Sequence, residues 1–138
     1  MDPDPRSLQK MQRHRATGET VLVIEDDPHV RRVLNLYLET SGYCVLTAGN
    51  GGEGLDRFRE NQGIIRVTIT DMRMKGMQGT EVIAELRKIN AHARIVVASG
   101  LSNIHELISE EPGRLVFVRK PMSKNELIAA VHTLIATA

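Results

Sequence analysis

The sequence predicts an α/β domain built on a parallel sheet of five strands, and three observations support this. Five short apolar runs alternate along the chain with segments whose apolar residues recur every three or four positions. The runs are almost continuously apolar, as expected of strands that are covered by helices on both faces. The chain has 138 residues, which fits one domain with its own core and no second domain of ordinary size.

The five apolar runs are rich in valine, isoleucine and leucine, which favour strands. We predict strands over residues 21–24, 43–47, 67–70, 95–98 and 115–118. Each run is followed by a segment with helical spacing of its apolar residues. We predict that these helices include residues 30–38, 53–58, 82–89, 104–108 and 127–135, the second being weak and the fourth short.

Helix ends are marked by capping residues and breakers. Asp27 can cap the first helix, and Pro28 suits its first turn. Ser123 and Glu126 have the spacing of a capping box before the last helix. The Glu-Pro-Gly sequence at residues 111–113 is expected to close the fourth helix.

Regular alternation of strands and helices leaves few topologies, because crossover connections between parallel strands are right-handed. Five such strands fit the doubly wound, flavodoxin-like order 2-1-3-4-5. Function in open sheets of this kind resides at the carboxyl ends of the strands. We therefore expect the residues that directly follow the strands to form the functional site.

Acidic, hydroxyl and basic side chains follow four of the predicted strands: Glu25, Asp26, Asp27, Asp71, Ser99 and Lys120. Two carboxylates about 4 Å apart repel by roughly 4 kcal/mol at an effective dielectric constant of 20. Mg²⁺ relieves such repulsion, since it prefers carboxylate oxygens and water. With Mg²⁺ and Lys120 holding phosphoryl oxygens, Asp71 is a candidate nucleophile and the Ser99 hydroxyl a candidate donor.

Four segments together resemble the signature segments of the response-regulator receiver domains of two-component signalling. The chemotaxis regulators are receivers of this kind. The four segments are VLVIEDDPHVR, ITDMRMKGMQG, VVASG and FVRKP, and the resemblance extends over residues 20–138. Within this family the chain most resembles the receivers of hybrid sensor kinases, on the basis of Gly18-Glu19-Thr20 and Ser99-Gly100.

The resemblance implies a metal site and a phosphoacceptor. Asp71 matches the phosphoacceptor, and Asp26 matches the direct Mg²⁺ ligand. Glu25 matches a second acidic position that acts on the metal through water, and the backbone carbonyl of Arg73 matches the third protein ligand. Lys75 departs from the family, which usually has proline there.

The resemblance also implies a switch. Ser99 and Lys120 match the hydroxyl and lysine that contact the phosphoryl group, and Phe117 matches an aromatic residue, usually tyrosine, that changes rotamer. A histidine kinase or histidine phosphotransfer protein would donate the phosphoryl group. A downstream protein would bind the face formed by helix four, strand five and helix five. The domain would be no enzyme beyond catalysing its own aspartyl phosphorylation and dephosphorylation.

Three other functions would share some of these features. A pseudo-receiver, which binds proteins without phosphorylation, is the main alternative, and the complete acidic set argues against it. A phosphatase like the haloacid dehalogenases needs a second aspartate where Arg73 stands. Gly49, Gly51 and Gly54 imitate a dinucleotide motif but follow a strand predicted at the sheet edge, so they are expected to loosen the second helix.

Composition excludes several other classes. The net charge of +1 gives no field that attracts nucleic acid, and no apolar run reaches the ~20 residues of a membrane helix. Cys44 is the one cysteine, and the first residues lack the apolar core of a secretory signal. We expect a cytoplasmic protein with a flexible tail over residues 1–18 and a receiver domain over residues 19–138.

Overall fold

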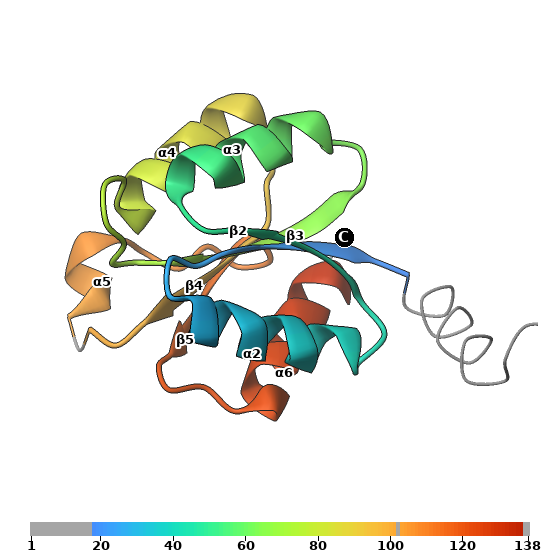
Figure 1. Cartoon of the computed structure of the whole chain (residues 1–138). Helices are drawn as coiled ribbons and strands as arrows, with labels where there is room; N and C mark the ends of the chain where they lie inside the picture. Colours follow the sequence, from blue (N-terminus) through green and yellow to red (C-terminus); the bar gives the residue numbers. More distant parts are fainter. Residues whose placement is uncertain (1–17, 102, 137–138) are drawn as a thin grey trace, which may run out of the picture.

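The computed structural model describes residues 18–101 and 103–136, so the predicted tail, except for Gly18, lies outside the described residues. It contains one parallel sheet in the predicted order, β2-β1-β3-β4-β5 (Figure 1). The strands are β1 (Thr20–Ile24), β2 (Cys44–Ala48), β3 (Ile65–Asp71), β4 (Ile95–Ser99) and β5 (Leu115–Arg119). The helices are α2 (Pro28–Glu39), α3 (Gly51–Glu60), α4 (Gly79–Ile89), α5 (Ile104–Leu107) and α6 (Lys124–Ala136).

Helices cover both faces of the sheet, as the continuous apolar runs predicted. Helices α3 and α4 lie on one face and α2 and α6 on the other, with α5 beside the β4–β5 end (Figure 1). Successive strand residues point to opposite faces, so Leu22 and Ile24 enter the α3–α4 core while Val21 and Val23 enter the α2–α6 core. No helix among the described residues is long and apolar enough to cross a membrane.

The helix ends match the predicted signals in part. Asp27 accepts the backbone N–H groups of His29 and Val30, so it caps α2 as expected. The Ser123 hydroxyl accepts the Glu126 N–H at 3.1 Å but donates to the Glu126 carboxylate, which leaves the capping box half formed. Helix α5 ends at Leu107, well before the predicted break at residues 111–113, which instead form the turn that enters β5.

The expectation that glycines loosen the second helix stays a prediction, but the structure shows a second role for two of them, which is close packing. Gly51 and Gly54 are buried in α3, and a Cβ atom at Gly54 would overlap the Ile24 side chain. Gly79, the first residue of α4, likewise lies against the backbone of Asp71 and Met72. Missing side chains thus let both helices approach the strands that carry the acidic residues.

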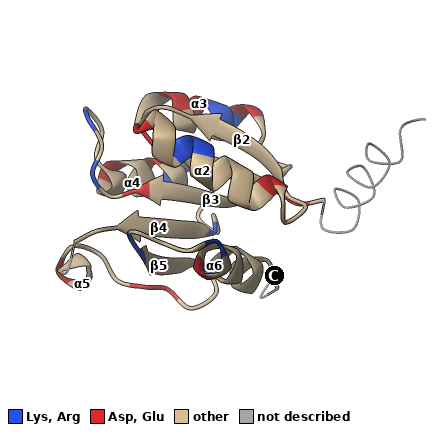
Figure 2. Ribbon diagram, turned by 60° about the horizontal axis from the view of Figure 1, so that its bottom comes forward, with Lys and Arg blue, Asp and Glu red and all other residues tan. Residues whose placement is uncertain are grey.

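Charged residues of both signs are interspersed along the helices and loops in the view of Figure 2. Several pair within one helix, such as Arg57 with Glu53 and Arg59 with Asp56. Exposed pairs of this kind contribute little stability.

Gly79→Ala is expected to lower the free energy of unfolding by about 1–3 kcal/mol, the usual cost of overpacking. The added Cβ would meet the Asp71 carbonyl oxygen and lie 2.8 Å from the Met72 Cα, and neither backbone atom can move aside freely. Urea unfolding measures this change. Gly63→Ala is the matched control, because a Cβ there meets nothing within 4 Å. Equal stability losses in the two variants would contradict the packing argument.

Candidate functional site

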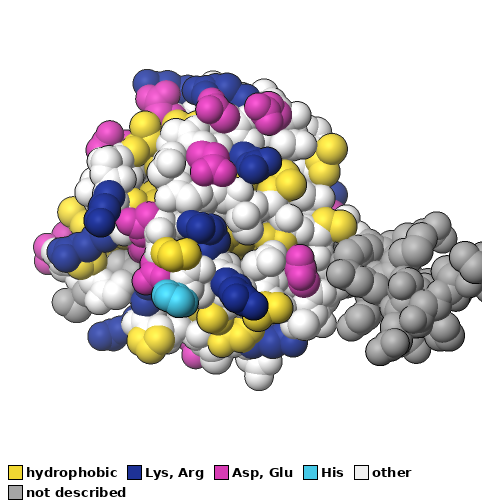
Figure 3. All heavy atoms as spheres, in the orientation of Figure 1, with side chains coloured by type: hydrophobic (Ala, Val, Ile, Leu, Met, Phe, Trp, Pro, Cys, Tyr) yellow, Lys and Arg dark blue, Asp and Glu magenta, His cyan; other side chains and the backbone are white. Residues whose placement is uncertain are grey.

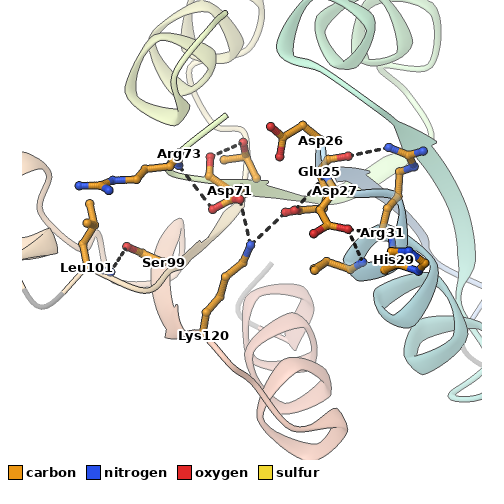
Figure 4. Close-up of polar contacts among 12 residues, drawn as sticks. Glu25, Asp26, Asp27, His29, Arg31, Asp71, Arg73, Ser99, Leu101 and Lys120 are labelled. Carbon is orange, nitrogen blue, oxygen red and sulfur yellow. Dashed lines mark hydrogen bonds and ion pairs between the residues drawn. The ribbon is translucent and has the colours of Figure 1, made fainter. Parts of the chain in front are cut away.

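Three carboxylates meet at the carboxyl ends of β1 and β3. Ile24 pairs with Thr70 across the two strands, which places Glu25 beside Asp71. One carboxylate oxygen from each of Glu25, Asp26 and Asp71 lies within 4.8 Å of the others (Figure 4). Glu25 is 2% exposed and Asp71 8% exposed, so two of the charges are held largely away from water.

Lys120 bridges two of these carboxylates from β5, on the other side of β4. Its Nζ lies 2.9 Å from Asp71 Oδ2 and 3.2 Å from Glu25 Oε2 (Figure 4). The backbone N–H of Lys120 also donates to the Ser99 carbonyl at 2.9 Å, which fixes the backbone directly after β5. The structure therefore brings together the predicted residues of three different strands.

Burial and close charges shift the pKa values of two residues in the cluster. Burial, followed by the charge of Asp71, raises the pKa of Glu25 from 4.5 to about 7, although Lys120 opposes the shift. Burial by itself lowers the pKa of Lys120, but its hydrogen bond to Asp71 and the charges of Asp71 and Glu25 outweigh this and raise that pKa. One ammonium group thus compensates the acidic cluster only in part.

Asp26 and Arg73 form the open side of the cluster. They line the same surface hollow of about 340 Å³. Asp26 Oδ2 accepts the Lys75 N–H at 3.1 Å, and Asp71 Oδ1 accepts the Arg73 N–H at 3.4 Å. Proline at position 75 could not donate that bond, so Lys75 adds a backbone tie to Asp26 that sequence reasoning did not foresee.

Two residues beside the cluster fix its backbone rather than adding a ligand. Asp27 follows the same strand as Glu25 and Asp26, but its side chain caps α2, and the bonds from the His29 and Val30 amides lower its pKa. Arg31 was not predicted as a site residue, yet its Nη1 donates to the Glu25 carbonyl at 2.9 Å (Figure 4). Arg31 therefore holds the acidic turn in place from the first helix.

Ser99 and Phe117 lie apart from the acidic cluster. The Ser99 hydroxyl accepts the Leu101 N–H at 2.9 Å rather than contacting Asp71 (Figure 4). Phe117 is half-buried, with its ring centroid 5.0 Å from that of His105, a neighbour that the sequence did not indicate. Ser99 and Phe117 line one cavity of about 250 Å³, so a path of open space joins the two predicted switch residues.

The donor set fits a hard divalent cation. Carboxylate oxygens are the ligands that Mg²⁺ prefers, and it commonly keeps several water ligands. Glu25, Asp26 and Asp71 offer such oxygens at one place, and the hollow beside Asp26 and Arg73 leaves room for water. The arrangement can therefore hold a cation next to a carboxylate that also contacts a lysine.

Comparison with known proteins points to one family. The model for the response regulator receiver domain matches residues 21–132. Transcriptional regulatory protein GlrR of Escherichia coli is 30% identical over 112 residues, which are 80% of this chain and 25% of that protein. ResD of Bacillus subtilis is 31% identical over 124 residues, 88% of this chain and 50% of that protein. The chain thus spans a quarter to a half of these relatives.

Solved structures of receiver domains are similar to this structure. A response regulator receiver domain protein from Clostridium thermocellum superposes with a TM-score of 0.79 at 31% identity, covering 86% of this chain and 94% of that one. TrrA from Thermotoga maritima, in complex with Mg²⁺–BeF, gives 0.73 at 32% identity, covering 84% and 98%. The receiver domain of the hybrid histidine kinase CckA gives 0.72 at 28% identity, covering 84% and 98%.

For metal-free protein, we expect Glu25 to make the free energy of unfolding fall as pH rises from 4.5 to about 7. In this window folded Glu25 keeps a proton that the unfolded chain has released, so its contribution is complete below 4.5 and lost by about 7. Urea unfolding of wild type and Glu25→Gln, in a chelator, measures this.

The two proteins differ only at position 25, so the difference between their pH profiles isolates the effect of Glu25. Wild type should lose about 1–3 kcal/mol relative to Glu25→Gln between acid and neutral pH. A difference that stays flat or grows in favour of wild type would show that burial does not raise the pKa of Glu25.

Proposed function

Because this chain belongs to the response regulator receiver domain family, we propose that Asp71 accepts a phosphoryl group in a Mg²⁺-dependent reaction and that this switches a protein-binding surface. Receiver domains are signalling domains of two-component systems and not classical enzymes. The observation that carries the proposal is the contact of Lys120 with both Asp71 and Glu25. A structural ion pair would need one carboxylate, whereas this lysine lies where phosphoryl oxygens on Asp71 would need a cation.

The chain's own residues account for each part of the transfer. An Asp71 oxygen attacks phosphorus, and the P–N bond to the donor's histidine breaks with the electron pair left on that nitrogen. Lys120 then contacts phosphoryl oxygens in place of the Asp71 carboxylate. Asp26, Asp71 and the Arg73 carbonyl would hold Mg²⁺, with Glu25 acting through water. When bound, Mg²⁺ neutralises charge that develops on the phosphoryl oxygens.

The switch would pass from Ser99 to Phe117. A phosphoryl group on Asp71 adds acceptor oxygens. The Ser99 hydroxyl, which accepts the Leu101 N–H, would turn toward Asp71 to donate its proton to one of them. Movement of Ser99 would enlarge the cavity of about 250 Å³ that it shares with Phe117 and give the aromatic ring a place to enter. Such a change alters the face formed by α5, β5 and α6, which we propose as the surface for the downstream protein.

The phosphodonor would approach beside α2. An apolar groove of about 480 Å³ is lined by Val30, Val33 and Tyr37 of α2 and by Pro121 and Met122. Figure 3 shows hydrophobic side chains exposed over this part of the molecule. Lys120 lines the groove and also contacts Asp71. A histidine kinase or phosphotransfer protein that places its histidine at Asp71 therefore covers the groove.

The pseudo-receiver remains the alternative, and the residues present do not favour it. It would need neither a buried Glu25–Asp71 pair nor a lysine held between the two carboxylates. The similar receiver TrrA has a structure in complex with Mg²⁺–BeF, which supports the Mg²⁺-dependent function.

Incubation with acetyl phosphate and Mg²⁺ should add the mass of one phosphoryl group to the wild-type protein. Intact-protein mass spectrometry measures the gain. We expect none in Asp71→Asn, which removes the nucleophile, and little without Mg²⁺. Asp27→Asn is the matched control, because Asp27 is an acidic neighbour whose side chain caps α2, and it should be phosphorylated like wild type.

A folded wild-type protein that gains no mass would favour the pseudo-receiver. A gain that persists in Asp71→Asn would place the phosphoryl group on another residue. Either result overturns the assignment of Asp71.

A further inference from the structure

A polar cavity of about 220 Å³ lies at the opposite end of the sheet from Asp71. It is lined by residues of α3, β3 and the α4–β4 connection, including Arg66, Thr68, His92 and Arg94. Figure 1 shows the α3–β3 and α4–β4 connections turning at the same end of the sheet. One water needs only ~10–15 Å³ of such space, so the cavity has room for a larger polar occupant.

Thr68 presents an unpartnered hydroxyl in this lining. It is 1% exposed, and within residues 18–101 and 103–136 its Oγ1 has no hydrogen-bond partner. A buried hydroxyl without a partner costs about 1–3 kcal/mol. Its backbone is fixed, because the Thr68 N–H donates to the Arg94 carbonyl at 2.9 Å. The hydroxyl therefore indicates an occupant of the cavity that can hydrogen-bond.

Arginine side chains set the charge of the cavity. Arg66 is partly neutralised by Glu19, whose Oε2 lies 3.2 Å from its Nη1. Arg94 forms no ion pair with any described residue, whereas Arg87 and Lys88 nearby in sequence pair with Glu111 and Glu85. Asn90 carries no charge, and its Oδ1 accepts the backbone N–H of His92.

We propose that this cavity binds a small oxyanion of phosphate or sulfate size. The groups left open are donors: the Arg94 guanidinium, the Thr68 hydroxyl and the His92 ring. Charge-assisted bonds from a guanidinium to an oxyanion are the strong ones. The carboxyl-terminal ends of α3 and α4 contribute about half a negative charge each, which the unpaired charge of Arg94 and the partly paired Arg66 offset. The site is separate from the phosphoacceptor and independent of it.

Inorganic phosphate is the probe, added to the ¹⁵N-labelled full chain in a chelator, with sodium chloride at matched ionic strength as reference. We expect saturable amide shifts at Thr68, Ala93 and Arg94, while the amides around Asp71 stay unchanged. Arg94→Gln should weaken binding about tenfold or more, since it removes a charged donor. Thr68→Val, which keeps the shape, should weaken it about threefold.

Arg114→Gln is the matched control, because Arg114 is an exposed arginine close to the start of β5 that does not line the cavity. It should bind phosphate as wild type does. Shifts no larger than those caused by chloride would overturn the proposal and leave water as the occupant. Equal weakening in Arg94→Gln and Arg114→Gln, or none in Arg94→Gln, would also overturn it.

Discussion

Repulsion among Glu25, Asp26 and Asp71 is the constraint on which the site depends. Their oxygens lie within 4.8 Å of one another, and each pair at such a distance repels by several kcal/mol unless it is compensated. Lys120 supplies one positive charge against three carboxylates, and burial, followed by the charge of Asp71, raises the pKa of Glu25. A site left negative in this way favours a divalent cation and, with it, a phosphoryl group.

The fold holds the carboxylates in place because strands and helices of both cores position the residues around them. Neighbouring strands β1 and β3 place Glu25 beside Asp71, and two cores fix the strands from both faces. Gly79 lets α4 begin against the Asp71 backbone, and Arg31 holds the Glu25 carbonyl from α2. Ser99 and Phe117, the proposed switch residues, border a cavity of about 250 Å³. The acidic cluster and the proposed switch residues thus occupy different parts of the sheet.

Sequence reasoning predicted the strands, their order and the convergence of the site, because parallel strands carry the residues that follow them to one edge. It could not predict contacts that depend on loop conformation. The Lys75 N–H reaches Asp26 across 49 positions, and Arg31 bonds a backbone carbonyl that has no sequence signature. The packing role of Gly54 required knowing that Ile24 faces α3. The cavity around Thr68 and Arg94 is assembled from separate segments, so no local pattern marks it.

The most direct test of the central claim is a Mg²⁺ titration of the full chain, followed by amide chemical shifts at neutral pH. The account predicts saturable binding of one ion, with shifts concentrated at Glu25, Asp26 and Asp71 and at residues 73–75, and loss of that binding in Asp26→Asn. Shifts that do not saturate, or binding that survives Asp26→Asn unchanged, would show that the carboxylate cluster is not a divalent-cation site.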